Sequence, residues 1–168
     1  AVVMDGSYFR GNVNSNAERV QILSAIKQTI DKTLSSTTNL PSEIFISCPG
    51  PFDYENGISL MDGMNKYQSL LGFNLKTFFA NITGIDLSSI YFYNDAAAFL
   101  LGEVVNKKME NRRVIGLTLG TGLGSSLYEN GTIVDLNLGS AVFSNGIVED
   151  FISTRGVLAH LTEKFGYI

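Results

Sequence analysis

Apolar residues recur at helical spacing early in the chain. The intervals are three or four residues, the period of one face of an α-helix, and the stripe consists of Val20, Leu23, Ile26, Ile30 and Leu34. This stripe predicts an amphipathic helix over residues 18–34. Ser15 and Asn16 precede it. Because both residue types cap helix N-termini, one of the two is expected to be the N-cap.

Strand and helix patterns interleave along the rest of the chain. Runs of β-branched and aromatic residues predict strands at 2–4, 43–48, 89–93 and 114–119. Turn dipeptides predict hairpins at Asp5-Gly6, Asn56-Gly57 and Asn130-Gly131. Further helices are expected to run from Asn74 to Gly84, to start at Asn94-Asp95, and to cover residues 154–165. The alternation predicts the α/β class.

One of these strands differs from the others in its apolar content. The run Val114–Leu119 is almost continuously apolar, which is typical of a strand buried on both faces. It follows the polar stretch Asn106–Arg113, where we expect a boundary between two lobes, residues 1–111 and residues 112–168.

Composition and charge exclude several classes of partner. The chain has 168 residues and a formal net charge of -4, and its one basic cluster, residues 107–113, is interrupted by Glu110. Nucleic-acid binding requires clustered Lys and Arg, so none is expected for this segment. Neither a signal-peptide pattern nor an apolar run of about 20 residues is present, so we expect a cytoplasmic protein without a membrane partner.

The sequence offers no metal-ligand cluster. Cys48 is the single cysteine and His160 the single histidine, whereas structural zinc sites need four such ligands. No protein-held metal is therefore predicted. A hydrolase triad is also difficult to assemble, because one histidine is available and no Gly-x-Ser-x-Gly elbow occurs.

A glycine-rich loop follows the apolar strand. In Gly120-Thr121-Gly122-Leu123-Gly124, the glycines allow backbone N–H groups to approach an anion, and Thr121 adds a hydroxyl donor. The spacing is GxGxG rather than GxGxxG, and no Gly-Lys-Ser/Thr follows, so neither a dinucleotide fingerprint nor a P-loop is present. The loop joins two strands. It is either a phosphate-binding loop or simply a tight hairpin.

Asn94-Asp95 lies where a predicted strand ends and a helix begins. Ligands bind at the carboxyl ends of strands in open α/β sheets, and a helix N-terminus favours a negative charge. Asp95 is therefore a candidate general base for a substrate hydroxyl, with Asn94 holding that hydroxyl or a neighbouring one. The alternative is a simple helix N-cap.

Three segments together resemble the signatures of the ROK family (repressor, open reading frame, kinase). They are SCPGPFDYENG, FYNDAAAFLLGEV and LTLGTGLGSSLYENGTI, in the family's order, and the resemblance covers roughly residues 2–157. It implies an actin-like ATPase (ribonuclease H-like) fold with two lobes and mixed sheets flanked by helices. It also implies ATP-dependent phosphorylation of a hexose or amino-sugar hydroxyl, with Mg²⁺, and a possible homodimer.

The resemblance assigns roles to individual positions. Asp95 corresponds to the catalytic base and Asn94 to a sugar ligand beside it. Glu149 is similar to a late sugar-binding glutamate, and Gly50 and Asn65 fall near positions that touch the sugar. The ATP phosphates are assigned to the loop residues Gly120, Thr121 and Gly122. Residues 1–111 would then be the sugar-binding lobe, and residues 112–168 the start of the ATP-binding lobe.

The sequence departs from the family pattern in three ways. Relatives begin with a strand carrying Asp-x-Gly-Gly-Thr, but residues 5–7 read Asp-Gly-Ser, so we expect that strand to lie outside this sequence. Residues 136–150 contain neither Gly-Glu-x-Gly-His nor a cysteine-rich zinc motif, and no zinc is expected. Relatives are also longer. The chain is thus interpreted as part of a kinase, a divergent kinase, or a non-catalytic sugar-binding regulator of the family.

Overall fold

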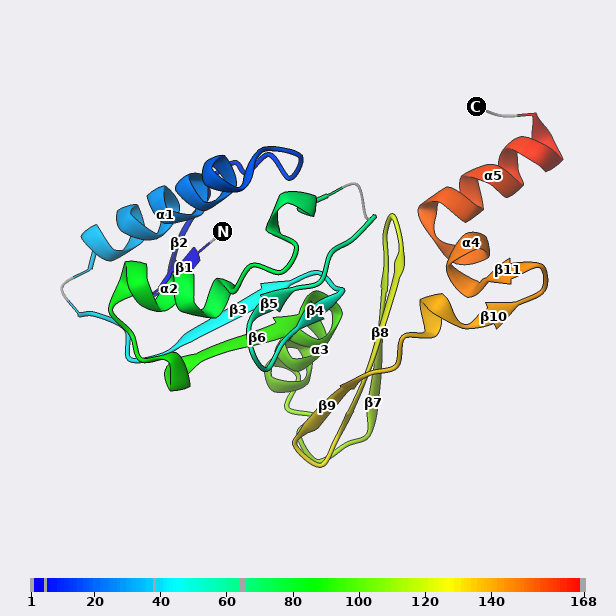
Figure 1. Cartoon of the computed structure of the whole chain (residues 1–168). Coiled ribbons are helices and arrows are strands. Elements are labelled where there is room, and N and C mark those ends of the chain that lie inside the picture. The colour runs from blue at the N-terminus through cyan, green and yellow to red at the C-terminus, as the bar shows by residue number, and fades with distance from the viewer. Residues whose placement is uncertain (1, 5, 38, 64–65, 167–168) are drawn as a thin grey trace. The chain divides into compact units, whose positions relative to one another are not determined.

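The chain forms two compact units of mixed α/β structure, Ala1–Phe92 and Tyr93–Ile168 (Figure 1). The structure is a computed structural model and describes residues 2–4, 6–37, 39–63 and 66–166. Within these ranges no helix combines the length and the apolar character that crossing a bilayer requires. Each unit is described by itself below.

The first unit contains two longer helices and several two-stranded sheets. Its elements are β1 (Val2–Met4), β2 (Ser7–Phe9), α1 (Arg19–Ser35), β3 (Ile44–Cys48), β4 (Phe52–Asp53), β5 (Ile58–Ser59), η1 (Gln68–Leu70), α2 (Leu75–Thr83), η2 (Leu87–Ser89) and β6 (Ile90–Asn94), whose last residues belong to the second unit. β1 pairs with β2, β4 with β5, and β3 with β6. The hairpin expected at Asp5-Gly6 is present as the β1–β2 pair, although Asp5 itself lies outside the described residues.

Helix α1 packs most of the predicted apolar stripe against the core: Ile30 is buried, and Leu23, Ile26 and Leu34 are partly buried against it. The departure is in the first turn. Val20 is 77% exposed, whereas Ile22 is 1% exposed. Two threonines join the buried face because their hydroxyls are satisfied within the helix: Thr29 donates to the Ala25 carbonyl at 3.0 Å, and Thr33 donates to the Thr29 carbonyl at 2.8 Å. Polar side chains can be buried when they are hydrogen-bonded, so counting apolar residues alone leaves Thr29 and Thr33 out of a face that it otherwise locates.

The predicted cap of α1 is also wrong. The N-cap position is Glu18, and its side chain makes no capping hydrogen bond. Asn16 instead donates its backbone N–H to Asn14 Oδ1 at 3.0 Å in the preceding turn. The local pattern for α2 is confirmed at both ends: Asn74 Oδ1 accepts the Thr77 N–H at 2.8 Å, and Gly84 closes the helix at φ 74°.

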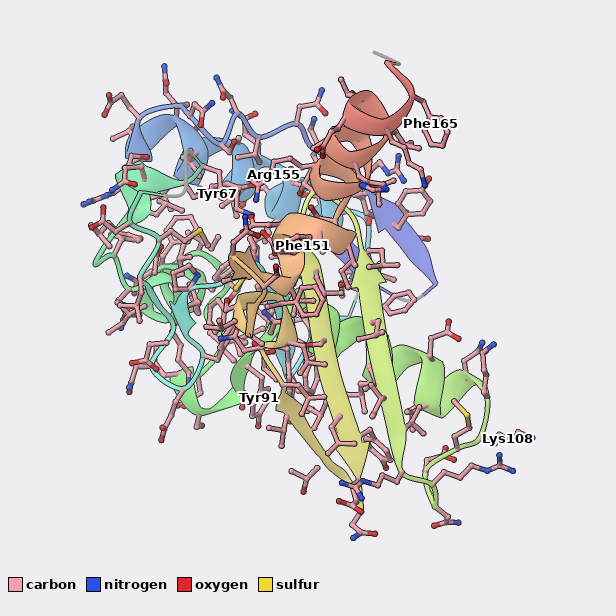
Figure 2. All side chains as sticks on the ribbon, turned by 90° about the vertical axis from the view of Figure 1, so that its right-hand side faces the viewer. Tyr67, Tyr91, Lys108, Phe151, Arg155 and Phe165 are labelled. Carbon is pink, nitrogen blue, oxygen red and sulfur yellow. The ribbon has the colours of Figure 1, made fainter. Side chains whose placement is uncertain are left out.

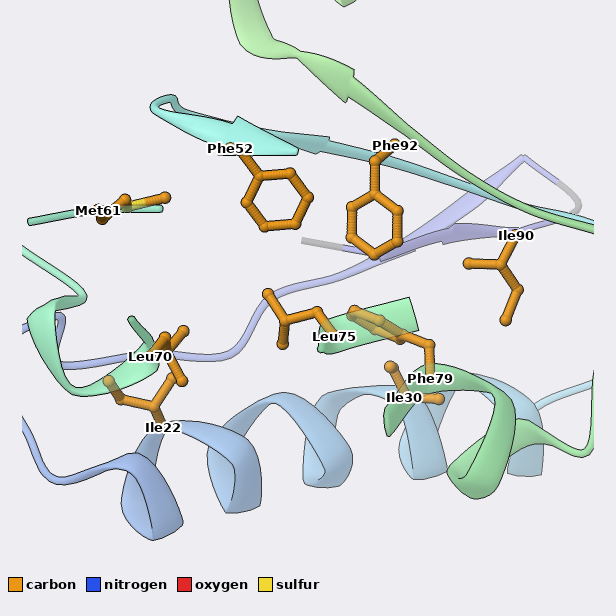
Figure 3. Packing of buried hydrophobic residues seen from close by; sticks show 9 residues of the cluster. All are labelled: Ile22, Ile30, Phe52, Met61, Leu70, Leu75, Phe79, Ile90 and Phe92. Atoms are coloured by element: carbon orange, nitrogen blue, oxygen red, sulfur yellow. The ribbon is translucent and has the colours of Figure 1, made fainter. Parts of the chain in front are cut away.

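The core of the first unit is a single buried cluster that contacts both helices and the strands (Figure 3). Three phenylalanines meet in it: the ring centroids of Phe52 and Phe92 are 5.1 Å apart, and those of Phe79 and Phe92 are 6.0 Å apart. The buried members are Ile22, Ile30, Phe52, Met61, Leu70, Leu75, Phe79, Ile90 and Phe92.

A cavity of about 620 Å³ lies beside this cluster. Consecutive residues of two strands line it, 2–4 from β1 and 44–48 from β3. Side chains of a strand alternate between its faces, so a cavity on one face would be lined by every second residue. The cavity therefore borders both β1 and β3, which belong to separate small sheets, β1–β2 and β3–β6.

The second unit is built on an antiparallel sheet in the order β7-β8-β9. Its elements are α3 (Asp95–Asn106), β7 (Val114–Leu119), β8 (Leu123–Glu129), β9 (Thr132–Asp135), η3 (Leu138–Ser140), β10 (Val142–Phe143), β11 (Gly146–Ile147), α4 (Val148–Ile152) and α5 (Thr154–Phe165). The predicted turn between β8 and β9 is confirmed, with Asn130 at φ 52° and Gly131 at φ 79°. Positive φ at both positions matches the twist of a hairpin.

Helix α3 packs on β7 and β8. Leu100 and Val104 of α3 are buried together with Tyr128 of β8. A Cβ at Gly116 of β7 would lie 3.0 Å from Leu100 Cδ1, so the glycine allows this close approach. The opposite side chains of β7 are exposed: 61% for Ile115 and 67% for Leu119. The prediction of burial on both faces is therefore wrong for this strand.

The sequence places a lobe boundary between residues 111 and 112, whereas the contacts within the chain divide it between Phe92 and Tyr93. The contact boundary falls earlier because α3 packs with β7 and β8, which follow it. The assignment of residues 1–111 to a sugar-binding lobe and of residues 112–168 to an ATP-binding lobe concerns function, and it stays a prediction.

Candidate functional site

The start of helix α3 is fixed by Asn94. Its Oδ1 accepts the Ala96 N–H at 2.9 Å and the Ala97 N–H at 3.4 Å. Asn94 is thus the N-cap of α3, the role that sequence reasoning kept as the alternative for this pair. The capping uses the carbonyl oxygen of its side chain, and the amide nitrogen is a separate group with two donor hydrogens.

Asp95 occupies the first helical position and is exposed. Its Oδ1 accepts the Ala96 N–H at 2.9 Å. For Oδ2, no hydrogen-bond partner is found among the described residues. One carboxylate oxygen therefore orients the side chain at the helix N-terminus, and the other remains available to accept a proton.

The glycine loop connects β7 to β8 at the register pair Leu119–Leu123. Gly120 is held on both sides, because its N–H donates to the Gly122 carbonyl at 3.0 Å and its own carbonyl accepts the Thr154 N–H at 2.8 Å. Within the described part of the chain, the N–H groups of Thr121 and Gly122 have no acceptor. Two consecutive backbone donors with no partner are what an anion-binding loop requires.

Gly124 brings the glycine loop close to the start of α3. A Cβ at this position would lie 2.7 Å from the Ala96 Cβ, closer than two carbon atoms can approach. Ala96 follows Asp95 directly, and Gly124 is two residues beyond Gly122. Asp95 and the loop are therefore neighbours within the second unit. Sequence reasoning assigned no role to Gly124, although its place in the GxGxG motif was the available signal.

Glu149 lies on α4 and reaches the same loop. Its Oε2 accepts the Leu123 N–H at 2.9 Å. A Cβ at Gly122 would lie 2.6 Å from this oxygen, and a Cβ at Gly139 would lie 3.3 Å from it. The carboxylate thus fits against two glycines. Sequence reasoning missed Gly139, since a single glycine in a loop carries no specific signal.

Helix α4, which carries Glu149, is anchored at both ends. Asp150 Oδ2 accepts the Ile147 N–H at 3.1 Å, and Asp150 Oδ1 accepts from Arg155 Nη2 at 3.1 Å. Phe151 packs edge-on against Phe143 with ring centroids 5.2 Å apart. Figure 2 labels Phe151 on α4 and Arg155 on α5. Together these contacts fix the position from which Glu149 reaches the loop.

The remaining predicted positions do not join this group within the second unit. Gly50 belongs to the first unit, in the turn between β3 and β4. Asn65 lies outside the described residues. The second unit therefore brings together Asn94, Asp95, the glycine loop and Glu149.

Among the described residues, the carboxyl groups of Asp53 and Asp86 have a pKa below the ordinary value, and both belong to turns of the first unit. The Asn56 backbone N–H, followed by the Asn56 side chain, lowers the pKa of Asp53. The Ser88 hydroxyl, followed by the Ser88 backbone N–H, lowers the pKa of Asp86. These hydrogen bonds stabilise the charged form. They hold turns of the first unit in place.

The described residues also indicate whether this site could hold a metal ion or a phosphate group. Among them, no three His, Cys, Asp or Glu side chains gather closely enough to hold a metal ion. Mg²⁺ in kinases is bound mainly by substrate phosphates, water and one or two carboxylates, so it does not require such a protein cage. The free N–H groups of Thr121 and Gly122 fit phosphate oxygens.

Comparison with known families identifies the chain's relatives. The model of the ROK family matches residues 8–141. The chain belongs to the ROK family. The match includes the three segments in which the sequence resembles this family. A search of curated proteins found no match.

Solved structures of ROK proteins share the fold at low identity. A glucokinase from Parabacteroides distasonis has a TM-score of 0.67 and 22% identity, over 89% of this chain and 47% of that one. A ROK transcriptional regulator, a homologue of the E. coli MLC protein, has a TM-score of 0.73 and 17% identity, over 89% of this chain and 41% of the regulator. An inorganic polyphosphate/ATP-glucomannokinase from Arthrobacter has a TM-score of 0.66 and 21% identity, over 88% and 58%.

This ROK chain thus spans about half the length of the structures that it resembles. The similarity supports the α/β fold of this family. Because the structures include both kinases and a regulator, the family alone does not decide between catalysis and regulation. The two-lobe arrangement and the ribonuclease H-like topology stay predictions.

Proposed function

We propose that this chain is part of an ATP-dependent kinase that phosphorylates a hydroxyl of a hexose or an amino sugar, with Asp95 as the general base. The observation that carries the proposal is the contact between Gly124 and Ala96. It brings the residue that follows Asp95 against the residue two positions beyond Gly122, and the loop has two N–H donors without an acceptor among the described residues.

The glycine loop would hold the transferred phosphate. Phosphoryl transfer is catalysed mainly by positioning and by stabilising charge on the phosphoryl oxygens. The N–H groups of Thr121 and Gly122 are suited to this task because they are fixed in place and need no reorganisation during the reaction. MgATP supplies the phosphoryl group, and Mg²⁺ neutralises part of its charge when bound.

Asp95 would take the proton from the sugar hydroxyl. As the bond between the sugar oxygen and the γ-phosphorus forms, the proton passes to Asp95 Oδ2. The bond from the γ-phosphorus to the bridging oxygen breaks, and ADP leaves. The hydrogen bond from the Ala96 N–H to Oδ1 holds the carboxylate in position for this transfer. Asn94, the helix cap, would hold the neighbouring sugar hydroxyl through its side-chain amide N–H.

A non-catalytic sugar-binding regulator of the same family is the second candidate. The similarity to a ROK regulator, with a TM-score of 0.73, favours it, as does the lack of Gly-Glu-x-Gly-His in residues 136–150. Such a protein would bind a sugar without turning over ATP. The two candidates therefore differ in one measurable quantity, the release of ADP.

The test is sugar-dependent ADP release by the full-length protein that contains this chain, assayed over a panel of hexoses and amino sugars. We expect turnover with at least one sugar, and a fall of about 10²- to 10⁴-fold in kcat for Asp95→Asn, the range for loss of a general base. Glu163→Gln removes a carboxylate from the exposed face of α5 and serves as the matched control with unchanged kcat.

Two results would contradict the kinase proposal. One is sugar binding without ADP release for every sugar of the panel, which supports the regulator instead. The other is equal kcat for the parent and Asp95→Asn, which removes Asp95 from the reaction even if the protein is a kinase.

A further inference from the structure

The glycine loop already holds an anion, the side chain of Glu149. The loop presents three consecutive backbone N–H groups, at Thr121, Gly122 and Leu123. Glu149 Oε2 accepts the third at 2.9 Å, while the first two have no acceptor among the described residues. A phosphate group that used the whole loop would need the donor that Glu149 occupies.

The carboxylate also fills space that only glycine leaves open. A Cβ at Gly122 would lie 2.6 Å from Oε2, 3.1 Å from Cδ and 3.4 Å from Oε1 of Glu149. All three atoms of the carboxylate therefore lie against Gly122. Gly139, in another segment, also borders this oxygen: a Cβ at Gly139 would lie 3.3 Å from Glu149 Oε2.

Glu149 takes part in none of the ion pairs found among the described residues. Those pairs join Lys27 to Asp31, Lys107 to Glu103, Arg113 to Glu129 and Arg155 to Asp150. The Glu149 carboxylate accepts instead from the Leu123 N–H. A second anion in the same loop would meet an uncompensated negative charge at short range.

We propose that the Glu149 carboxylate competes with phosphate for the glycine loop and so acts as an internal gate. In this arrangement a phosphate binds fully only after the carboxylate leaves Leu123. Glu149 is then a positioning residue for the phosphate donor, acting through the loop.

This inference rests on the proposed function, because it takes the loop to be the phosphate site. The competition between Glu149 and phosphate would also couple phosphate binding to the binding of a second ligand. Any ligand that attracts the Glu149 carboxylate away from Leu123 raises the affinity of the loop for phosphate, and by linkage phosphate raises the affinity for that ligand. A polyhydroxyl substrate, which donates hydrogen bonds to carboxylates, has the required chemistry.

The experiment measures pyrophosphate binding to the full-length protein by isothermal titration calorimetry, without nucleotide, sugar or Mg²⁺. Glu149→Gln keeps the side-chain shape and a carbonyl acceptor for the Leu123 N–H but removes the charge. We expect this variant to bind pyrophosphate about tenfold more tightly than the parent. A residue with a merely structural role would weaken binding when replaced. A gain shows that the Glu149 charge opposes pyrophosphate, and the Leu123 amide resonance then shows whether the carboxylate leaves the loop.

A second readout follows the contact itself. In protein labelled with ¹⁵N-leucine, the Leu123 amide resonance of the parent is expected to shift on pyrophosphate binding, as the carboxylate is replaced by phosphate oxygen. Glu163→Gln is the charge-matched control and is expected to bind pyrophosphate like the parent.

The outcomes separate the two proposals. If pyrophosphate binds the parent and Glu149→Gln equally, or the variant more weakly, the gate is wrong and the phosphate loop stands. If pyrophosphate binds neither protein, the loop is not a phosphate site, and both proposals fail.

Discussion

The two units of the chain differ in how they hold their residues in place. In the first unit, buried aliphatic and aromatic side chains from α1, α2, β4 and β6 form one continuous cluster. In the second unit, the buried cluster is limited to Leu100, Val104 and Tyr128 among the described residues, and the outer face of β7 is exposed. The second unit nevertheless contains Asp95, the glycine loop and Glu149.

The difference indicates that the candidate site is positioned by backbone contacts rather than by a large core. Gly116 and Gly124 bring α3 against the sheet, and Gly122 and Gly139 admit the Glu149 carboxylate. A glycine lets two segments approach closely and so sets their distance and orientation, whereas the burial of apolar side chains mainly adds to the free energy of unfolding. We therefore expect core substitutions in the first unit to change stability most, and substitutions at the second unit's glycines to change both stability and function.

The largest effect is expected for Ile22→Ala in α1. Ile22 is 1% exposed, and truncating a buried isoleucine to alanine costs about 2–5 kcal/mol of unfolding free energy. Val20→Ala on the same helix removes a side chain that is 77% exposed and should change stability by no more than about 0.5 kcal/mol. Urea unfolding of both variants measures the difference. Equal losses would contradict the difference in burial between these two positions.

An intermediate effect is expected for Gly124→Ala in β8. Its new Cβ would lie 2.7 Å from the Ala96 Cβ, so β8 and α3 must separate at a cost of about 1–3 kcal/mol. Because this contact also places Asp95 beside the loop, kcat for sugar phosphorylation should fall at the same time.

Gly102→Ala provides the matched control for this glycine. Gly102 lies within α3, and a Cβ there meets nothing within 4 Å. This change should stabilise the helix by about 0.5–1 kcal/mol and leave kcat unchanged. If thermal unfolding and activity respond alike in the two variants, the contact between β8 and α3 does not organise the site.

The smallest effect concerns the Asp53 carboxyl group of the first unit. Hydrogen bonds from Asn56 lower its pKa in the folded state. A lowered folded-state pKa means that the group adds stability at pH values above its unfolded pKa, and that this stability is lost as the pH falls through the folded pKa. Asp53→Asn should therefore be slightly less stable than the parent at pH 7 and equal to it near pH 2.

Thermal unfolding over this pH range tests the Asp53 prediction. A difference between Asp53→Asn and the parent that persists unchanged at the acidic end would show that the hydrogen bonds of the charged carboxylate are not its cause.

Local rules explain which elements the sequence predicts well. The limits of α2 follow from Asn74 and Gly84, the turn between β8 and β9 follows from Asn130-Gly131, and the range predicted for the last helix matches α5, Thr154–Phe165. Each depends on hydrogen bonds or backbone angles within a few neighbouring residues. The local sequence is therefore sufficient to predict these elements, since no distant segment takes part in their hydrogen bonds or backbone angles.

The buried faces of helices and strands, and the contacts between distant segments, were harder to predict because they depend on residues far away in the sequence. The apolar stripe predicts the burial of Ile30, but the exposure of Val20 and the burial of Thr29 and Thr33 depend on what packs against α1 and on hydrogen bonds that an apolar count ignores. Helix α4, Val148–Ile152, is too short to show a period and was not predicted. The exposure of Ile115 and Leu119 likewise depends on which segments cover β7.

Neighbouring residues and their order predict the order of strands and helices, the Asn-Asp pair at a helix start, the glycine loop after a strand, and membership of the ROK family through three spaced motifs. The packing of distant segments, which no local pattern reveals, brings Ala96 against Gly124 and the Glu149 carboxylate to the Leu123 N–H. Such contacts join residues about 26–28 positions apart, and their geometry is set by how α3, the sheet and α4 pack.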